Sequence, residues 1–520
     1  MKNFGLMGVA ALMVSLPSFA GGLLTNTNQN VAFLRNPARD GAIGIDGVYS
    51  NPAGVSFLGA GFHLSLNIQS AYQTREVTST FGGFRYGAGN NGATKTFKGD
   101  AQAPVIPSFQ AAYNWKRWSV SAGFAIGGGG GKCEFDDGLG SFECQAALLP
   151  MLLGDKMGIT RYSMDSYMRG RQYYYGFQLG AGYKINDHLS VFVGGRLVYA
   201  TCNYYGYVKN IQVNVPGTET MTPASGFFKG QMSAALEKVG EYKGLAEQAA
   251  AAGNAEAAAQ YADAAAKAGE AARQMGTLGV ATEDVELNCD QQDWGFQPII
   301  GLDFKYGKWN VGAKYEFKGR LRLKNRSANS ASAANLSALD PYRDGNKMAA
   351  DIPGLLTLGV QYEILPSLRV NAGYHHFFDK QARQDADSHK LLKNNSNEYL
   401  LGVEYDINDR WQVSAGAQST NYGMTDAYIK DMSFNVSSAS VGLGLGVKLT
   451  ERVKLNLAYF QTFYSTYDRE TDDYNNLSRT VAVAAGEESV EKLMKAGALK
   501  GSDSFTRTNK VFGIGVDFKF

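Results

Sequence analysis

The stretch "EYLLGVEYDINDRWQ", residues 398–412, contains the two signals that decide the fold. Its first part alternates, with Tyr399, Leu401, Val403, Tyr405 and Ile407 at every second position and Leu400, Gly402, Glu404 and Asp406 between them. Side chains of a β-strand point alternately to opposite faces, so such a strand has one apolar and one largely polar face. A short polar turn, "DINDRWQ" (406–412), follows directly. The stretch therefore predicts a half-buried strand that reverses through a tight turn.

The same pattern recurs along the chain. Alternating strands are predicted at 309–317 and 356–364, and five more short polar turns at "NWKRWS" (114–119), "KINDHLS" (184–190), "KYGKWN" (305–310), "EILPSLR" (363–369) and "KLTERVK" (448–454). Several turns have Trp or Tyr beside them, as residues at a membrane interface do. The other connections are long. A soluble sandwich also alternates, but short turns at one end and long loops at the other are typical of an outer-membrane barrel.

Six turns join twelve strands, and two more complete the count. The first is expected at about 61–79 and the last at about 507–520, where "VFGIGVDFKF" ends on Phe520. That ending resembles the carboxy-terminal signature of bacterial outer-membrane barrels. The fold predicted for residues 58–520 is all-β, a 14-stranded antiparallel transmembrane β-barrel, and an even strand number is the rule for this class.

Composition agrees with an exported barrel. The chain has 520 residues, with 62 Gly, 29 Tyr and 28 Phe but only 4 Cys, and its net charge of +2 gives no indication of nucleic-acid binding. The mean hydropathy of -0.24 is compatible with a membrane barrel, because every second residue of its strands is polar. Residues 1–20 read as a signal peptide, with Lys2, an apolar stretch from Phe4 to Leu16 and a small-x-small site ending at Ala20.

The segment between the expected cleavage site and the first strand is polar and Gly-rich. We predict that residues 21–57 fold back into the lumen as a plug, because a barrel of fourteen strands has an interior wide enough to need filling. "SNPAG", residues 50–54, ends this segment. Pro52 fixes its φ and has no N–H, and the Asn51 side chain can bond to nearby backbone, so the motif holds the chain where it enters the wall.

The segment "VAFLRNPARDGAIGIDGVYSNPAG" (31–54) resembles the N-terminal hatch of the long-chain fatty-acid transporter family (FadL/TodX type). In that family an Asn-Pro-Ala motif closes a small plug before the first of fourteen strands, and Asn51, Pro52 and Ala53, followed by Gly54, match it by position. The resemblance implies outer-membrane uptake of hydrophobic small molecules, with long-chain fatty acids the prototype. It further implies capture among extracellular loops, passage to a pocket near the hatch and lateral release into membrane lipid through a gap beside the third strand, without cofactor, metal or catalysis and in a monomer.

Several residues are candidates for this route. The lateral gap is predicted at Gly127, Gly128, Gly129, Gly130 and Gly131, since glycines allow a strand to bend, although such a run equally fits the start of a flexible loop. Candidate ligand-binding residues are Leu23, Leu24 and Phe33 in the plug and Phe227, Phe228 and Met232 at the start of the longest loop. That loop, about 211–285, is Ala-rich with a break at Gly253-Asn254, which predicts two helices in a hairpin. A ligand groove, a structural cap and an adhesive surface are equally consistent with it.

The four cysteines are expected to form disulfides, because an even number in an exported protein favours pairing. Three pairings are possible, and the strand order most easily permits Cys133–Cys144 together with Cys202–Cys289.

Alternative functions are an outer-membrane enzyme, a haemin receptor and a structural or adhesive barrel. His375 and His376, with Asp379, are the candidates for acid–base or haem chemistry, but adjacent strand residues face opposite sides, so only one of the two can face inward. No convincing nucleophile motif accompanies them, and we interpret the pair as solvated at the barrel rim.

Overall fold

The computed structural model describes residues 28–90, 92–335 and 337–520. The predicted signal peptide and two candidate ligand residues, Leu23 and Leu24, lie outside the described residues. Within the described ranges, none of the helices combines the length and the apolar character that crossing a membrane requires.

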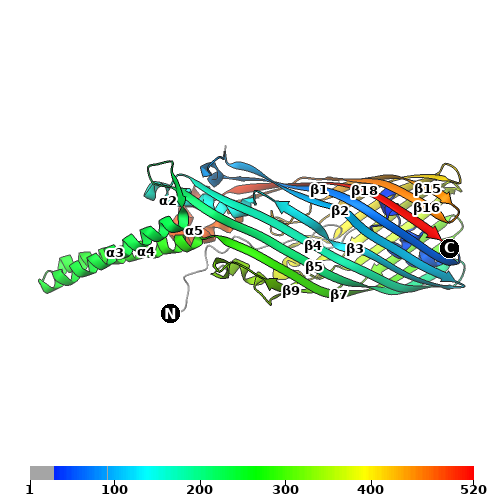
Figure 1. Ribbon diagram of the computed structural model, residues 1–520, viewed down its shortest axis with the longest axis horizontal. Helices are drawn as coiled ribbons and strands as arrows, with labels where there is room; N and C mark the ends of the chain where they lie inside the picture. Colours follow the sequence, from blue (N-terminus) through cyan, green and yellow to red (C-terminus); the bar gives the residue numbers. More distant parts are fainter. Residues whose placement is uncertain (1–27, 91, 336) are drawn as a thin grey trace.

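Fourteen antiparallel strands form a closed barrel, as predicted (Figure 1). The wall strands are β1 (Gly61–Phe81), β2 (Thr94–Trp115), β3 (Trp118–Phe135), β4 (Tyr162–Lys184), β5 (Leu189–Asn214), β7 (Val285–Tyr306), β8 (Trp309–Glu316), β11 (Leu355–Leu365), β12 (Leu368–Phe377), β13 (Ser396–Asp406), β14 (Trp411–Asn421), β15 (Ser438–Thr450), β16 (Val453–Tyr464) and β18 (Gly501–Lys519). Four short strands extend the sheet beyond them: β6 (Met221–Pro223), β9 (Arg322–Ser327), β10 (Lys347–Ala349) and β17 (Tyr467–Thr471).

The ends of the wall meet directly. β1 pairs with β18 from His63↔Lys519 to Phe81↔Gly501, which closes the barrel without an edge strand. All six predicted turns are present, and they join β2–β3, β4–β5, β7–β8, β11–β12, β13–β14 and β15–β16 at one end of the barrel.

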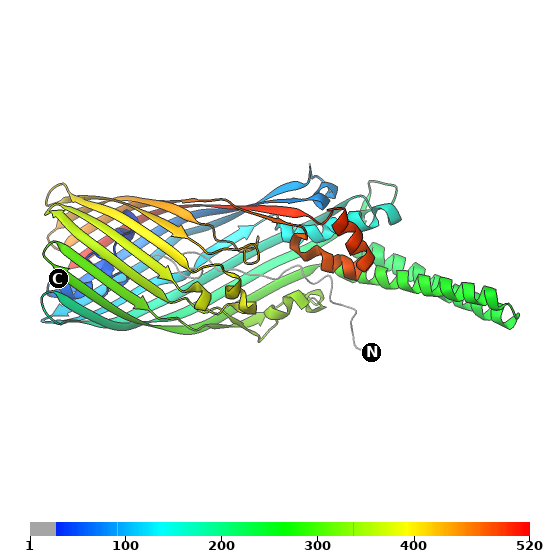
Figure 2. The ribbon, with the colours of Figure 1, turned by 180° about the vertical axis from the view of Figure 1, so that it is seen from behind.

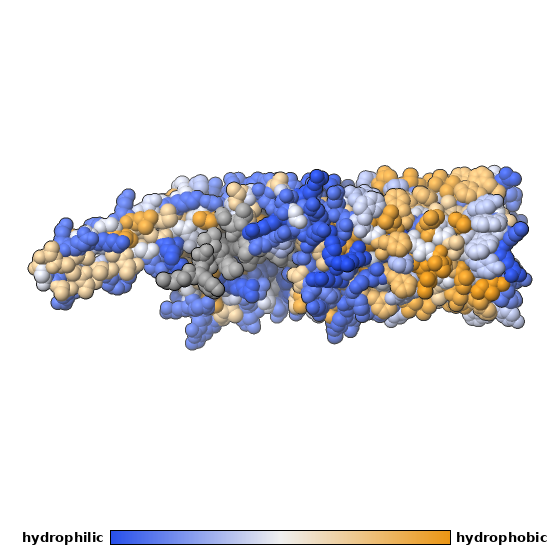
Figure 3. All heavy atoms as spheres, turned by 90° about the horizontal axis from the view of Figure 1, so that it is seen from below, coloured by the Kyte–Doolittle hydropathy of each residue, from blue (hydrophilic) through white to orange (hydrophobic). Residues whose placement is uncertain are grey.

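The exterior is apolar beside these turns and polar beyond, toward the loops (Figure 3). Outward side chains in the apolar part include Leu66, Ile68, Leu179, Val193 and Ile514, all exposed. An apolar band of this kind is typical of the lipid-facing wall of an outer-membrane barrel.

The long loops build a cap over the polar end and carry all the helices except three short ones, which lie within residues 31–57. The α-helices are α1 (Val31–Arg35), α2 (Gly140–Met157), α3 (Ala224–Ala251), α4 (Ala255–Ala281), α5 (Leu477–Ala485) and α6 (Glu487–Lys495). Short 3-10 helices are η2 (Ile45–Val48), η3 (Gly54–Phe57), η4 (Gly82–Tyr86), η5 (Ser332–Asn335), η6 (Ser337–Tyr342), η7 (Asp379–Gln381), η8 (Asp385–Leu391) and η9 (Tyr474–Asn476).

The predicted helical hairpin is α3 and α4, which project away from the barrel (Figure 1). α5 and α6, red in Figure 2, lie beside the base of the hairpin. At the tip, Asn254 caps α4 by accepting a hydrogen bond from the Ala257 N–H at 3.1 Å. α2, α5 and α6 were not predicted, because the sequence reasoning treated their loops as irregular.

Residues 28–57 lie inside the barrel, and most of their side chains are buried. Inward-facing glycines on the wall allow this segment to approach very closely. A Cβ on Gly312 would lie 2.2 Å from the Asp40 carbonyl oxygen, and one on Gly442 would lie 2.2 Å from that of Leu34. The wall thus has glycine at points where the backbone of the inner segment touches it.

Candidate functional site

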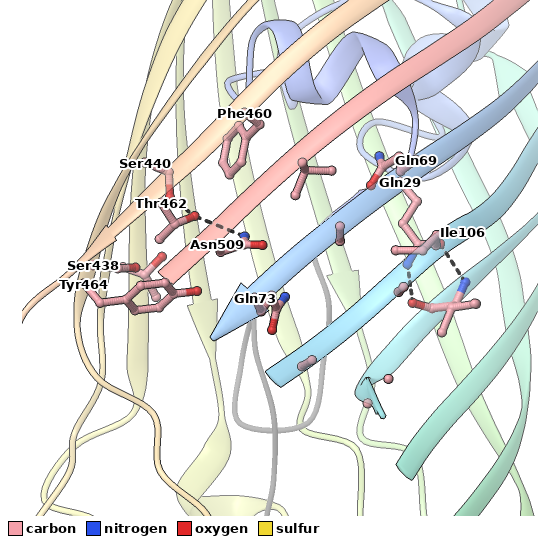
Figure 4. Close-up of a pocket in the computed structure, with 18 of the residues that line it drawn as sticks. Gln29, Gln69, Gln73, Ile106, Ser438, Ser440, Phe460, Thr462, Tyr464 and Asn509 are labelled. Atoms are coloured by element: carbon pink, nitrogen blue, oxygen red, sulfur yellow. Dashed lines mark hydrogen bonds between the residues drawn. The ribbon is translucent and has the colours of Figure 1, made fainter. Parts of the chain in front are cut away.

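A cavity of about 160 Å³ lies between the inner segment and the wall (Figure 4). Part of its lining is polar, with Gln69, Gln73, Gln418, Thr420, Thr462 and Asn509. The other part is apolar, with Ala71, Ala103, Ile106, Phe460 and Val511. An apolar cavity of roughly 150 Å³ is large enough for a benzene ring, so this one can hold a single ring or a short stretch of an alkyl chain.

Next to the cavity the wall is interrupted. The pairing of β2 with β3 stops at Ala101↔Cys133 and resumes at Phe109↔Phe124. Between these points, residues 102–108 and 125–132 do not pair with each other across the wall. In a membrane barrel, the backbone N–H and C=O groups normally form hydrogen bonds with the neighbouring strands. Where two strands do not pair, these groups need other hydrogen-bond partners.

Both strands contain residues that disfavour pairing here. On β3, Gly129 and Gly131 have φ of +85° and +73°, values that L-residues with a side chain rarely adopt, and the register with β4 shifts at the same place. On β2, Pro104 and Pro107 have no N–H to donate. The glycine run therefore lies within β3, along the unpaired stretch. The two prolines of β2 also indicate an unpaired stretch, and they were not used in the prediction from sequence.

The cavity reaches the interruption. Besides the lumen-facing residues, its lining includes Gly129 and Gly131 at the edge of β3 and Tyr173 of β4. Tyr173 belongs to an outward row of rings with Tyr175 and Tyr199, with centroid distances of 5.9 and 6.4 Å between successive members. The interruption is therefore the candidate for the predicted lateral opening between the lumen and the lipid-facing side.

Gln29, at the start of the described chain, bridges this opening (Figure 4). Its amide Nε2 donates to the Ile126 carbonyl at 2.6 Å, and its Oε1 accepts from the Ile126 N–H at 2.8 Å. On the opposite side, the Ser108 hydroxyl donates to the Gln29 carbonyl at 2.9 Å. One residue of the inner segment therefore supplies the partners that β2 and β3 do not supply to each other.

The predicted Asn-Pro-Ala motif lies where the inner segment leaves the lumen. The Asn51 amide donates to the Asp303 carboxylate of β7 at 2.5 Å and accepts from the Gly54 N–H at 3.2 Å. The Ser190 hydroxyl of β5 donates to the Ala53 carbonyl at 2.7 Å, and Pro52 packs near Gly301. The motif attaches the segment to two wall strands just before η3 and β1.

Buried ion pairs hold the rest of the inner segment. Arg39 lies 2.8 Å from both Asp46, within the segment, and Glu404 of β13. On the wall, Arg196 and Lys314 share Glu316 at 2.6 and 2.7 Å. Breaking one partner of such a buried pair is strongly destabilising, because it leaves the other charge uncompensated.

His375 connects the cavity to the inner segment. Its Nδ1 lies 2.8 Å from the Glu398 carboxylate, which lines the cavity, and its Nε2 lies 3.0 Å from Asp40. Both ring nitrogens therefore lie within hydrogen-bond distance of a carboxylate. The interpretation of a solvated histidine pair is therefore wrong for His375, which is buried, while His376 points the other way and bonds to Asn397. With both nitrogens engaged, His375 has no free position for haem iron.

The predicted disulfides are wrong: all four cysteines are free and buried. In the ladder, Cys202 faces Gln291 and Tyr204 faces Cys289, so the two thiols are diagonal rather than opposite. Diagonal neighbours are about 7–8 Å apart, beyond the usual Cα–Cα span of a disulfide. Cys133 lies in β3 and Cys144 in α2, not in one loop.

The remaining candidate ligand residues fall into two places. Phe33 packs on Phe460, which lines the cavity, with their ring centroids 6.3 Å apart. Phe228 is fully buried beneath the base of the hairpin, beside the partly buried Phe227. Met232, one turn further, packs on Gly276 of α4. These three stabilise the attachment of the hairpin and do not line the cavity.

Across the described part of the chain, no group of three or more His, Cys, Asp or Glu side chains is placed to hold a metal ion. The arrangement instead provides a small mixed cavity, a lateral opening and an anchored inner segment.

Comparison with known proteins shows the fold. No protein-family model matches the chain, and no curated protein sequence does either. Among solved structures, a Pseudomonas aeruginosa FadL homologue is similar over 96% of this chain and 100% of its own, with a TM-score of 0.60 and 13% identity. The P. putida toluene transporter TodX is similar over 92% of this chain and 94% of its own, with a TM-score of 0.51 and 13% identity.

Proposed function

We propose that this chain is a member of the FadL/TodX-type family and carries hydrophobic small molecules across the outer membrane, long-chain fatty acids or similar lipids first among them. Residues 21–57 act as its hatch. The fold and the apolar exterior support the location, and the carriage of toluene by TodX supports a hydrophobic cargo. The interrupted pairing of β2 with β3 beside the cavity is the observation that carries the proposal.

The route begins at the polar end of the barrel. A second cavity of about 130 Å³ lies there among the loops, and Tyr174, Tyr204, Leu323, Tyr342 and Met348 form part of its lining. A molecule captured there passes to the cavity beside Gln29 and leaves between β2 and β3. A purely structural or adhesive barrel would need neither a cavity nor an opening.

Lateral release is favoured by the hydrophobic effect. Each buried methylene contributes about 0.8 kcal/mol, so release of a sixteen-carbon chain into water would cost roughly 12 kcal/mol. Release into the bilayer avoids most of that cost. The cavity is smaller than a sixteen-carbon chain. One end of the chain is therefore held in the cavity while the rest of the chain extends through the opening.

A reversible cross-link across the opening tests the proposal. A Cβ on Gly131 would lie 4.0 Å from the Cβ of Ala103, within the range that a disulfide spans, and the φ of +73° at Gly131 means that a cysteine there adds some backbone strain. We expect the double variant Ala103→Cys and Gly131→Cys, once oxidised, to lose uptake of a labelled long-chain fatty acid in whole cells. Reduction should restore uptake.

The matched control links the same two strands where they already pair. Ala111 and Ala122 are register partners, so Ala111→Cys with Ala122→Cys should cross-link without affecting uptake. Full cross-linking between positions 103 and 131 with unchanged uptake would show that molecules leave by another route.

A further inference from the structure

A row of basic side chains faces outward on the loop side of the wall, on β9 and the residues that lead into it. The stretch "KGRLRLKNRS" (318–327) has a cation at every second position: Lys318, Arg320, Arg322, Lys324 and Arg326. Between them, Leu321, Leu323 and Asn325 are buried, whereas the basic residues are exposed or half-buried. Side chains of an extended segment alternate between two faces, so this stretch directs its cations to the exterior.

Lys347 of β10 adds a sixth cation to this basic row. It is exposed and is the register partner of Lys324 in the pairing of β10 with β9. Residues directly opposite each other in an antiparallel pair have Cβ atoms about 4.5–5.5 Å apart, and like charges in this arrangement are destabilising. The arrangement therefore becomes more favourable when an anion lies beside the two lysines.

Carboxylates compensate little of this charge. Lys318 and Arg322 share one carboxylate, that of the buried Asp351. Within the described ranges, no carboxylate lies at ion-pair distance from the other four members of the row, Arg320, Lys324, Arg326 and Lys347. Asp290 of β7 is the register partner of Arg326 but lies beyond that distance. On β3 and β5, by contrast, Lys132 and Lys209 each bind a glutamate.

The row begins where the apolar part of the exterior ends. Phe317, which is exposed, directly precedes Lys318, and the exposed Trp294 of β7 lies two residues from the register partner of Lys324. Aromatic side chains of this kind mark the boundary between the hydrocarbon and the headgroups. Figure 3 shows the exterior changing from apolar to strongly hydrophilic toward the loops. The row is therefore at the level of the headgroups of the outer leaflet.

We propose that the basic row binds the phosphate groups of an outer-leaflet lipid, a phosphorylated glycolipid of the lipid A type. Guanidinium groups bind phosphate oxygens through pairs of N–H donors, and lysines add compact positive charge. Side chains on one face of a strand repeat roughly every 6–7 Å, so a head with two phosphates can contact several of them at once. The inference depends on the membrane location of the barrel and not on the molecule that it carries.

Lipid binding by the purified full-length protein in a non-ionic detergent tests the inference, with native mass spectrometry as the readout. The probes are lipid A with two phosphates, the same lipid after removal of both phosphates, and inorganic pyrophosphate. We expect the phosphorylated lipid to bind about 100-fold more tightly than the dephosphorylated one, because each Lys or Arg beside an anionic lipid head contributes about fivefold and at least three are available. Pyrophosphate at the same concentration should not displace the lipid, because it has no acyl chains.

Substitutions assign the effect to the basic row. One variant combines Arg320→Gln, Lys324→Gln and Arg326→Gln. It should bind phosphorylated lipid A about 100-fold more weakly and dephosphorylated lipid A as before. All three side chains are exposed, so the variant should fold, as judged by heat-modifiable migration. Lys347→Gln, a smaller change, should weaken binding about fivefold and replaces the triple variant if that one does not fold.

The matched control removes the same charges, two arginines and one lysine, at the opposite end of the wall. It combines three exposed positions beside the short turns: Arg410→Gln, Arg452→Gln and Lys448→Gln. This control should bind phosphorylated lipid A as the unmodified protein does.

Three outcomes would overturn the inference. Equal binding of phosphorylated and dephosphorylated lipid A would show that the protein recognises only the acyl chains. Equal weakening in the control variant would show that net charge, rather than the basic row, accounts for binding. Displacement of the lipid by pyrophosphate at equal concentration would indicate a site for free phosphate. Each of these results leaves the proposed transport function standing, because the row lies outside the barrel.

Discussion

Gln29 is the residue whose removal should most directly loosen the lateral opening. Its side chain bonds to both the N–H and the carbonyl of Ile126, a residue that β2 does not pair. We predict that Gln29→Met, which keeps the size of the side chain but removes its amide, opens the segment around Ile126. Uptake of hydrophobic molecules should then become faster.

The magnitude follows from the two lost hydrogen bonds. An intramolecular hydrogen bond contributes about 1 kcal/mol net, so the loss of both corresponds to about 2 kcal/mol. Local opening would then be about 30-fold more frequent, and amide exchange in this segment would accelerate by the same factor. Hydrogen exchange measured by mass spectrometry on a peptide covering residues 124–128 reports this rate.

Gln69→Met is the matched control, because Gln69 lines the same cavity and its Nε2 has no hydrogen-bond partner within the described ranges. It should leave exchange at residues 124–128 unchanged. Equal exchange in Gln29→Met and the unmodified protein would refute the reasoning, since the opening would then be held by something other than Gln29.

Three further predictions concern the inner segment and the cysteines. Deletion of residues 23–48 should leave a folded barrel with a larger single-channel conductance, and unchanged conductance would contradict the assignment of a hatch. Asn51→Ala removes a buried hydrogen bond to the Asp303 carboxylate, which contributes about 1.5–3 kcal/mol. Residues 28–57 should then become sensitive to proteases in the folded barrel, and full protection would count against Asn51 as the attachment of this segment. Burial raises the pKa of the Cys144 thiol well above its usual value, so a soluble maleimide should label it slowly until the protein is denatured, and unreduced protein should contain four free thiols. Rapid labelling, or a disulfide-linked peptide, would refute this prediction.

Much of the wall could be predicted because its signals are local. Strand alternation and polar turns need only neighbouring residues, and Asn51-Pro52 marks the end of the inner segment in the same way. The cavity depends instead on register between distant strands: Gln73 and Asn509 become neighbours only when β1 meets β18. The cysteine prediction failed for the same reason, since a shift of two residues between β5 and β7 separates thiols that appear adjacent in strand order.

The interruption between β2 and β3 was only half visible in the sequence. The glycine run of β3 indicated a bend, but an opening also requires the facing strand to leave its pairing, and Pro104 and Pro107 of β2 had not been considered. The bridging role of Gln29 could not be predicted at all, because it depends on where the inner segment lies against the wall.

The seam between β1 and β18 has a consequence for how the molecule assembles. The two strands that close the barrel are the first and last of the chain, so the seam has the greatest sequence separation of all the strand pairings and carries the largest loop-closure entropy. β1 follows the inner segment with only a few residues between them, and the backbone of that segment touches inward glycines of strands far along the chain. We therefore expect the inner segment to be in place before β1 pairs with β18, while the wall is still an open, curved sheet. Once β1 pairs with β18, the closed wall surrounds the inner segment on all sides.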